Sequence, residues 1–151
     1  MKESFQKANE ELKRIDHLVY VTLKYTRTVD VLISILKRMI NSYEFAVDAL
    51  LKAAEKQEKI ENIPEIPLVK AQKVKEIYKQ KIIQKNIDRY LKLRKLIRSN
   101  YEKSNEYRRH VTMTSIVDGD IVKINIDIVS EMFDSIRKFI DFVHELIIKN
   151  D

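Results

Sequence analysis

The chain has 151 residues, of which 44% are hydrophobic and 34% are charged, and its formal net charge is +6. These values predict a single, mostly helical domain and exclude a disordered chain, and the lack of cysteine excludes disulfides, thiolate metal sites and a cysteine nucleophile. The polar N-terminus and the short apolar runs, such as Val31–Leu36, predict neither a signal peptide nor a membrane span, so we expect a cytoplasmic protein.

The first predicted element is a long helix over residues 3–60. Neither glycine nor proline occurs between Met1 and Glu61, and one set of residues recurs in alternating steps of three and four. This spacing is typical of a helix packed lengthwise on another helix. The set comprises Leu12, Ile15, Val19, Thr22, Thr26, Val29, Ile33, Leu36, Ile40, Tyr43, Val47, Leu50 and Ala54. An unbroken helix would be about 85 Å long; the alternative is a break near residues 27–30 or at Asn41, where capping residues occur.

The stretch Asn62-Ile63-Pro64-Glu65-Ile66-Pro67 predicts the end of the first helix and the start of a second. Asparagine tolerates the left-handed backbone that closes a helix, and the prolines prevent its continuation. Pro67 suits the first turn of the next helix, which we expect over about residues 67–107. Because the connection is short, this second helix should run antiparallel to the first.

The positive charge is concentrated in the second helix. Residues 67–98 contain eleven lysines and arginines against two acids, Glu76 and Asp88, whereas residues 1–66 are neutral and residues 99–151 have a net charge of −3. Tyrosines are interleaved with the basic residues at Tyr78, Tyr90 and Tyr101. A dense basic stripe attracts a polyanion by releasing its counterions, and tyrosine rings stack on unpaired bases.

The basic helix and the residues after it therefore form the candidate nucleic-acid-binding site. Its residues are Lys81, Lys85, Arg89, Lys92, Arg94, Lys95, Arg98, Tyr101, Tyr107, Arg108, Arg109 and His110. The same charge would also suit an acidic protein partner or an anionic surface. A third interpretation is a solvated helix face that binds nothing, although such a face usually carries acids four residues from its bases.

A β-hairpin is predicted over about residues 110–126. Asp118-Gly119 is a preferred centre for a two-residue turn, and the apolar residues around it alternate with a period of two. Closing this turn pairs Ile116 with Ile121. One face then carries His110, Thr112, Thr114, Ile116, Ile121, Lys123, Asn125 and Asp127, and the other carries Val111, Met113, Val117, Val122, Ile124 and Ile126 with Ser115 and Asp120. The apolar face should either cap the helical bundle or belong to a sheet whose edge pairs with a second copy.

The last predicted element is a helix over about residues 127–149, with Asp127 as its N-cap. The hairpin register also makes Asp127 a neighbour of His110, beside Arg108 and Arg109. Such a cluster would orient an imidazole for proton transfer or bind a phosphate. The simpler interpretation is a helix cap next to an exposed strand end.

Arg137, Asp141 and His144 lie on one face of this last helix, at positions i, i+4 and i+7. An arginine and a histidine separated by four to six residues resemble the signature of the HEPN families, helical bundles that often cleave RNA as dimers. The resemblance covers Arg137 and His144, while Lys138 stands where those families favour a small polar residue. It implies an RNA-cleaving role for the pair; the simpler interpretation is a polar helix face with an internal salt bridge.

No metal or cofactor is expected, because His17, His110 and His144 lack ligand spacing and one glycine cannot form a phosphate-binding loop. The sequence thus predicts a mainly α-helical protein: a long antiparallel helical hairpin or bundle, a small two-stranded β-hairpin and a C-terminal helix. The expected function is non-enzymatic nucleic-acid binding or an architectural role, as a homodimer. The alternatives are a coiled-coil-like protein–protein scaffold that uses the long apolar stripe, and an RNA-cleaving bundle of the HEPN type.

Overall fold

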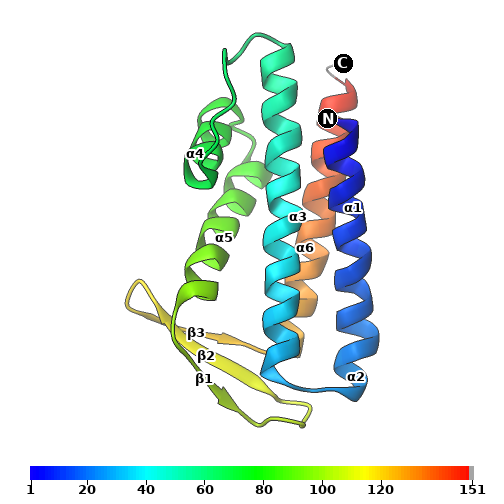
Figure 1. The fold of residues 1–151 in the computed structure, drawn as a ribbon, viewed down its shortest axis with the longest axis vertical. Helices are drawn as coiled ribbons and strands as arrows, with labels where there is room; N and C mark the ends of the chain where they lie inside the picture. The colour runs from blue at the N-terminus through cyan, green and yellow to red at the C-terminus, as the bar shows by residue number, and fades with distance from the viewer. Residues whose placement is uncertain (150–151) are drawn as a thin grey trace.

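The computed structural model describes residues 1–149 and is mainly α-helical, with a small antiparallel sheet before the C-terminal helix, which confirms the predicted fold class (Figure 1). In chain order the elements are α1 (Lys2–His17), the π-helical turn η1 (Leu18–Thr22), α2 (Leu23–Tyr25), α3 (Val29–Lys56), α4 (Pro67–Ile77), α5 (Lys81–Arg98), β1 (Tyr101–Ser104), β2 (Thr112–Val117), β3 (Asp120–Ile124) and α6 (Ile126–Lys149).

The prediction of one unbroken helix over residues 3–60 is wrong, and the alternative of a break near residues 27–30 is confirmed. The chain reverses at residues 26–28, and α3 returns antiparallel alongside α1 (Figure 1). Thr28 has an extended backbone, and its Oγ1 accepts a hydrogen bond of 3.3 Å from the Val31 amide, so it caps α3. Folding back buries both halves of the apolar stripe against each other, with Ile15 and Leu36 fully buried. A straight rod would leave that surface in water.

α3 ends earlier than the asparagine–proline stretch predicts. Its last residue is Lys56, and Glu58 adopts the left-handed conformation with φ of 59°. The Lys59 amide then donates to the Ala54 carbonyl at 2.9 Å, which satisfies an acceptor at the helix end. The prediction for Pro67 is confirmed, because this residue opens α4.

The predicted second helix over residues 67–107 is also wrong as one element. It breaks into α4 and α5 at residues 78–80, where Tyr78 is buried and its hydroxyl donates to the Leu50 carbonyl at 2.8 Å. The Gln84 side-chain amide donates to the carbonyls of Lys75 (2.8 Å) and Tyr78 (2.7 Å). These bonds satisfy the acceptors that the end of α4 leaves free. α5 then ends at Arg98, and the chain continues as a strand.

The sheet has the order β1-β2-β3, so it contains a third strand beyond the predicted hairpin. The two-residue turn is confirmed: Ile116 pairs with Ile121, and Asp118 and Gly119 have φ of 53° and 84°. The predicted segregation of the two faces also holds. Val111, Met113, Ser115, Val117 and Ile124 are buried, whereas Ile116, Ile121 and Lys123 are exposed.

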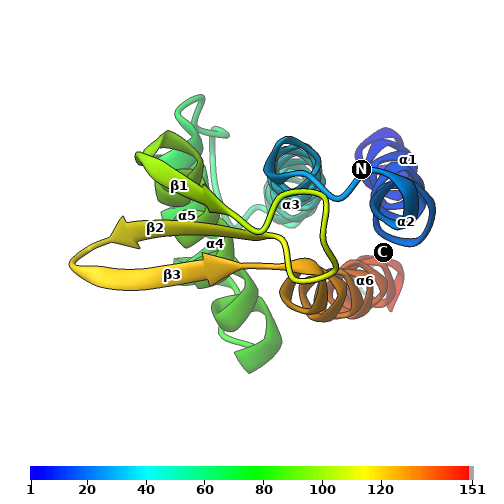
Figure 2. The same cartoon turned by 90° about the horizontal axis from the view of Figure 1, so that it is seen from below.

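The inner face of the sheet packs against the lower end of the helical bundle, beside α5 and α3 (Figure 1). Figure 2 views the molecule from below, with the sheet toward the reader, α4 and α5 behind it, and α3 and α6 nearly end-on beside it. The buried Ser115 hydroxyl donates to the Asn100 carbonyl at 2.6 Å, tying β2 to the segment that leaves α5. The sheet therefore caps the bundle.

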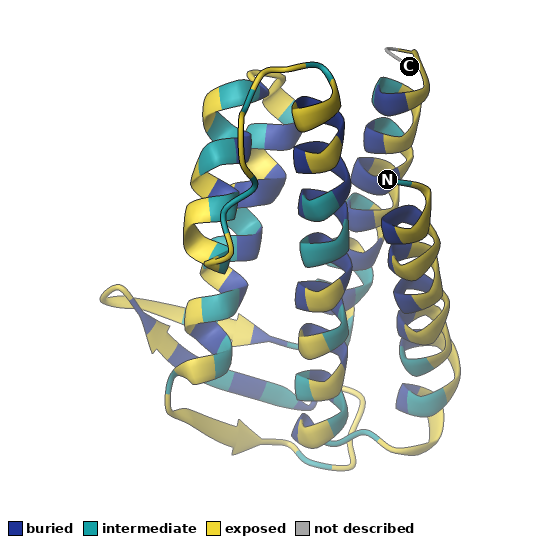
Figure 3. Cartoon of the chain, turned by 45° about the horizontal axis from the view of Figure 1, so that its top comes forward, coloured by how far each residue is buried: buried dark blue, intermediate teal, exposed yellow. Residues whose placement is uncertain are grey.

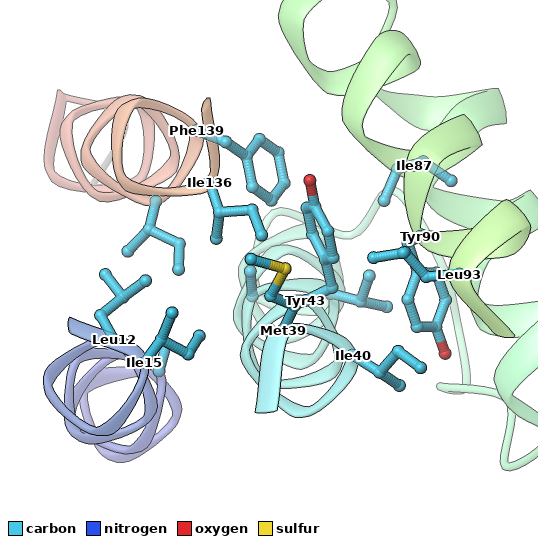
Figure 4. Packing of buried hydrophobic residues seen from close by; sticks show 14 of the residues in the cluster. Leu12, Ile15, Met39, Ile40, Tyr43, Ile87, Tyr90, Leu93, Ile136 and Phe139 are labelled. Atoms are coloured by element: carbon cyan, nitrogen blue, oxygen red, sulfur yellow. The ribbon is translucent and has the colours of Figure 1, made fainter. Parts of the chain in front are cut away.

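The hydrophobic core lies between α1, α3, α5 and α6 (Figure 4). Tyr43 of α3 occupies its middle, with its ring 5.5 Å from that of Phe139 on α6 and 6.0 Å from that of Tyr90 on α5. Exposed residues follow the outer faces of the helices and the whole of β1 (Figure 3). Among the described residues, no helix combines the length and apolarity needed to cross a bilayer.

Candidate nucleic-acid interface

The outward face of α5 carries a row of charged side chains. Ile87, Tyr90 and Leu93 turn toward the core (Figure 4), and Ile83 is buried as well, so the opposite face of the helix meets solvent. The exposed residues at alternating steps of four and three form one face along the helix. We call this row the α5 stripe; it comprises Lys81, Lys85, Asp88, Lys92 and Lys95.

Three lysines of the α5 stripe are available to a ligand. Lys81, Lys85 and Lys92 are exposed, and within residues 1–149 none of them makes an ion pair or a side-chain hydrogen bond. Asp88, the acid between them, is engaged by Lys75 of α4. Lys95, at the end of the row, pairs with Asp118 of the hairpin turn at 2.9 Å.

Ion pairs with other segments neutralise part of the basic surplus. Arg94 contacts Glu44 of α3 at 3.0 Å, and Lys70 contacts Asp48 of the same helix at 2.9 Å. Lys73 pairs with Glu76 within α4. The available charge is therefore smaller than the local count in the sequence indicates. Among the described residues of this segment, the exposed cations without an ion pair are Lys81, Lys85 and Lys92 of the α5 stripe, with Lys79 just before α5 and Arg98 at its end.

Arg89 and Arg94 lie on the flanks of α5 and not in the stripe. Glu44 Oε2 accepts hydrogen bonds from the Tyr90 hydroxyl at 2.8 Å and from Arg94, whose guanidinium lies 5.7 Å from the centre of the Tyr90 ring. Burial and the hydrogen bond to Glu44 both raise the pKa of Tyr90. Burial likewise raises the pKa of Tyr43 to about 12, and the nearby Arg89 guanidinium opposes that increase. Arg94 thus helps to join α5 to α3, and Arg89 lies near Tyr43 of α3. Arg98 is exposed at the end of α5, where its Nε donates to the Arg94 carbonyl at 3.3 Å.

The predicted site residues from Tyr107 to His110 lie in a second region, separated from α5 by the length of β1. The loop of residues 105–110 approaches the turn between α2 and α3 (Figure 2). The Tyr107 amide donates to the Arg27 carbonyl at 2.6 Å, and Glu106 Oε2 accepts from the Val29 amide at 3.1 Å. The Tyr107 ring is 78% exposed and Arg108 is exposed. Tyr101, on β1, is partly exposed between the two regions.

The predicted neighbour pair of His110 and Asp127 is replaced by a different contact. Asp127 Oδ1 accepts from Arg109 at 2.8 Å, and His110 is exposed. Asp127 is also not the N-cap of α6, so that prediction is wrong. Asn125 is the cap, because its Oδ1 accepts from the Ile128 amide at 2.9 Å.

Arg137 and His144 lie on an exposed face of α6, beside α1. The Arg137 guanidinium contacts Asp134 at 2.8 Å and lies over the Phe133 ring, with 5.0 Å to the ring centre. The His144 ring meets the Phe5 ring edge-on, with 4.9 Å between centres. The two residues are separated by about two helical turns, so the structure leaves the HEPN resemblance a prediction.

Two other features of the sequence, its acidic and histidine side chains and its long apolar stripe, lead to no site in the described residues. The described part of the chain contains no group of three or more His, Cys, Asp or Glu side chains arranged to hold a metal. The long apolar stripe of residues 12–54 is largely buried between α1, α3 and their neighbours, so most of it packs inside a single chain.

No family model, curated protein or solved structure matched this chain.

Sequence reasoning overlooked the outer face of the sheet. The pair Ile116 and Ile121 is 65% and 70% exposed, although it belongs to the face predicted to be polar. The sequence did contain a signal for this exposed apolar pair: on the face of the hairpin that is otherwise polar, two isoleucines stand among threonines, a lysine and an asparagine.

Proposed function

We propose that this protein binds nucleic acid through phosphate contacts made by the α5 stripe, without catalysing a reaction. One observation carries the proposal: Lys81, Lys85 and Lys92 project from one face of one helix and are free of acidic partners in the part of the chain described. A lysine that already forms an ion pair within the protein would have to break that pair before it could bind a phosphate. Lys81, Lys85 and Lys92 can bind a phosphate without breaking an ion pair.

The geometry of the α5 stripe suits a nucleic-acid backbone. From Lys81 to Lys95 the helix rises roughly 21 Å, which matches about six nucleotides of one strand at 3.4 Å each. Helical placement fixes the spacing of the ammonium groups within the reach of their flexible stems. Contacts of this kind fix position and carry no sequence information, so we expect binding to any sequence.

The loop of residues 105–110 would add a second contact. Arg108 is exposed, and the exposed Tyr107 ring offers a face on which an unpaired base would stack. A strand that spans both regions would follow β1 past Tyr101. We therefore expect single-stranded nucleic acid to bind more tightly than a duplex, because the duplex cannot use the ring.

The proposal is tested by the salt dependence of binding. A labelled 20-nucleotide single strand is titrated with the wild-type protein, and fluorescence anisotropy is recorded from 25 to 300 mM KCl. Three phosphate contacts on a single strand predict a slope of about −2 in log K against log salt concentration. Absence of binding at low salt, or an affinity that does not change with salt, would overturn the proposal.

The same reactions report on the HEPN-type alternative. An RNA strand that stays intact after prolonged incubation with the wild-type protein, without added metal, excludes ribonuclease activity. Cleavage that is lost in a folded His144→Ala variant would instead support the RNA-cleaving alternative.

A further inference from the structure

The outer face of the sheet has an ordered arrangement of charged and apolar side chains. In one row across the strands, Glu102 of β1 pairs with Thr114 of β2, which pairs with Lys123 of β3. In the neighbouring row Ile116 pairs with Ile121. The face therefore has an acid at one edge, a base at the other edge and a threonine between them, next to an apolar pair.

Four of these side chains are exposed to solvent. Ile116 and Ile121 are both more than half exposed, and Glu102 and Lys123 are exposed. Neither charge has an ion-pair partner anywhere in residues 1–149. Within the described residues they form no ion pair with each other, and Thr114 of β2 lies between them.

A hollow of about 520 Å³ adjoins the apolar pair. It is open to solvent and lies where β1 leaves α5; its lining residues are Asn100, Tyr101, Glu102, Thr114, Ser115, Ile116 and Ile121. Most of the lining residues belong to β2 and to the segment that leads into β1 and begins it, and Ile121 of β3 lines the opposite edge of the hollow.

We propose that the outer face of the sheet binds a second copy of this chain, face to face, about a twofold axis parallel to β2. Such an axis exchanges the two edges of the sheet, so it places Glu102 over Lys123 of the partner subunit and Lys123 over the partner's Glu102. It also places each Ile121 over the other copy's hollow. One surface thereby complements itself in charge and in shape, as a twofold interface requires.

The packing distance fits this arrangement. Facing sheets lie about 10 Å apart, which lets side chains of both faces interdigitate and lets a glutamate reach a lysine across the gap. The sheet is at the end of the bundle, so the two bundles would extend in opposite directions from it (Figures 1 and 2). Because three short strands bury a small area, the dimer should be reversible.

The charge pattern favours a second copy over a polyanion at this face. Glu102 would repel phosphates, and the face otherwise offers one free cation, Lys123, among the described residues of its three strands. The α5 stripe is outside the interface. The dimer proposal therefore does not depend on nucleic-acid binding, and the variant Lys85→Gln should dimerise like the wild type.

The experiment is a charge exchange read by sedimentation velocity between about 1 µM and 1 mM, the range expected of a small interface. The wild-type protein should sediment as a monomer–dimer equilibrium. Glu102→Lys or Lys123→Glu alone should weaken dimerisation at least roughly tenfold, because each places like charges opposite each other twice. The double variant Glu102→Lys/Lys123→Glu should restore the wild-type dissociation constant.

Mixing provides the decisive control. Each single variant repels itself, but a mixture of Glu102→Lys with Lys123→Glu restores both opposite-charge contacts and should form a heterodimer. Circular dichroism and the thermal midpoint confirm that every variant is folded, which is expected because both positions are exposed. Three results would each overturn the proposal. The wild-type protein could stay monomeric throughout the concentration range, the two single substitutions could leave the dissociation constant unchanged, or the single variants could stay monomeric when mixed.

Discussion

The Tyr43 hydroxyl donates a hydrogen bond of 2.8 Å to Asn86 Oδ1, joining α3 to α5 inside the core. Both side chains are buried, and the Asn86 amide in turn donates to the Ile82 carbonyl at 2.8 Å. Asn86 lies on the face of α5 roughly opposite the α5 stripe. This polar contact therefore helps to set the rotation of α5 and, with it, the outward direction of Lys81, Lys85 and Lys92.

Tyr43→Phe should lower the free energy of unfolding by about 1–3 kcal/mol, because it leaves the buried Asn86 oxygen without its donor. Urea denaturation followed by circular dichroism measures this change. The matched control is Tyr25→Phe, which removes a hydroxyl from a ring that is 83% exposed and should change stability little. Equal stability of the two variants would show that the Tyr43–Asn86 bond does not hold the helices together.

Stability should fall at alkaline pH because of the same tyrosine. Burial raises the pKa of Tyr43 from 10.0 to about 12 in the folded protein, so its contribution is complete below pH 10. Between pH 10 and pH 12 the unfolded chain loses the proton while the folded protein keeps it, and stability decreases. Urea titrations at several pH values should show a shallower decrease for Tyr43→Phe than for the wild type. If stability decreased equally with pH in the two proteins, the decrease could not be assigned to Tyr43.

Ser42→Ala should stabilise the protein. Ser42 is fully buried in α3, and its hydroxyl has no hydrogen-bond partner within the described chain. Removing it eliminates the cost of an unsatisfied polar group, about 1 kcal/mol or more, and alanine also favours the helix. An increased thermal midpoint in differential scanning calorimetry checks the change. A decrease would indicate that the hydroxyl makes a contact with bound water.

Asn125→Ala should cost about 0.5–2 kcal/mol, because this residue caps the α6 amides. Asp127→Ala removes an exposed ion pair with Arg109 and should cost less, at most about 1 kcal/mol. Chemical denaturation of the two variants under the same conditions shows which one loses more free energy of unfolding. The reverse order would restore Asp127 as the cap of the helix.

The hairpin could be predicted from the sequence because its information is local. Asp118-Gly119 determines the turn, and the alternation around it determines the register, so Ile116 and Ile121 were paired correctly. Pro67 likewise marked the start of a helix through its own backbone geometry. Each of these signals acts within a few residues.

The sequence left the reversal at Thr28 as one of two alternatives, and it gave no sign of the break after Ile77. A stripe at steps of three and four looks the same whether a helix continues or folds back on itself, and no glycine marks the turn. The break after α4 depends on the Gln84 side chain, which satisfies carbonyls several residues away. The four residues of β1 are all exposed and carry no apolar alternation.

The candidate site was overestimated for a related reason. Counting charges along residues 67–98 treats every lysine and arginine as free, but Glu44 and Asp118 come from distant segments to meet Arg94 and Lys95. Only the folded chain shows which cations keep their charge for a partner. Counting charges correctly placed the basic surplus along residues 67–98, and the structure shows that ion pairs occupy part of it.

The measurement that tests the central claim most directly compares two variants with equal loss of charge. One is Lys81→Gln/Lys85→Gln/Lys92→Gln; the other is Lys24→Gln/Lys37→Gln/Lys138→Gln, at exposed positions outside α4 and α5. In anisotropy titrations of a single strand, the α5 variant should reduce the steepness of the salt dependence by about 2 and lose at least roughly tenfold in affinity at low salt. The control variant should stay close to the wild type. Equal losses in both variants, or no loss in either, would contradict the assignment of nucleic-acid binding to the α5 stripe.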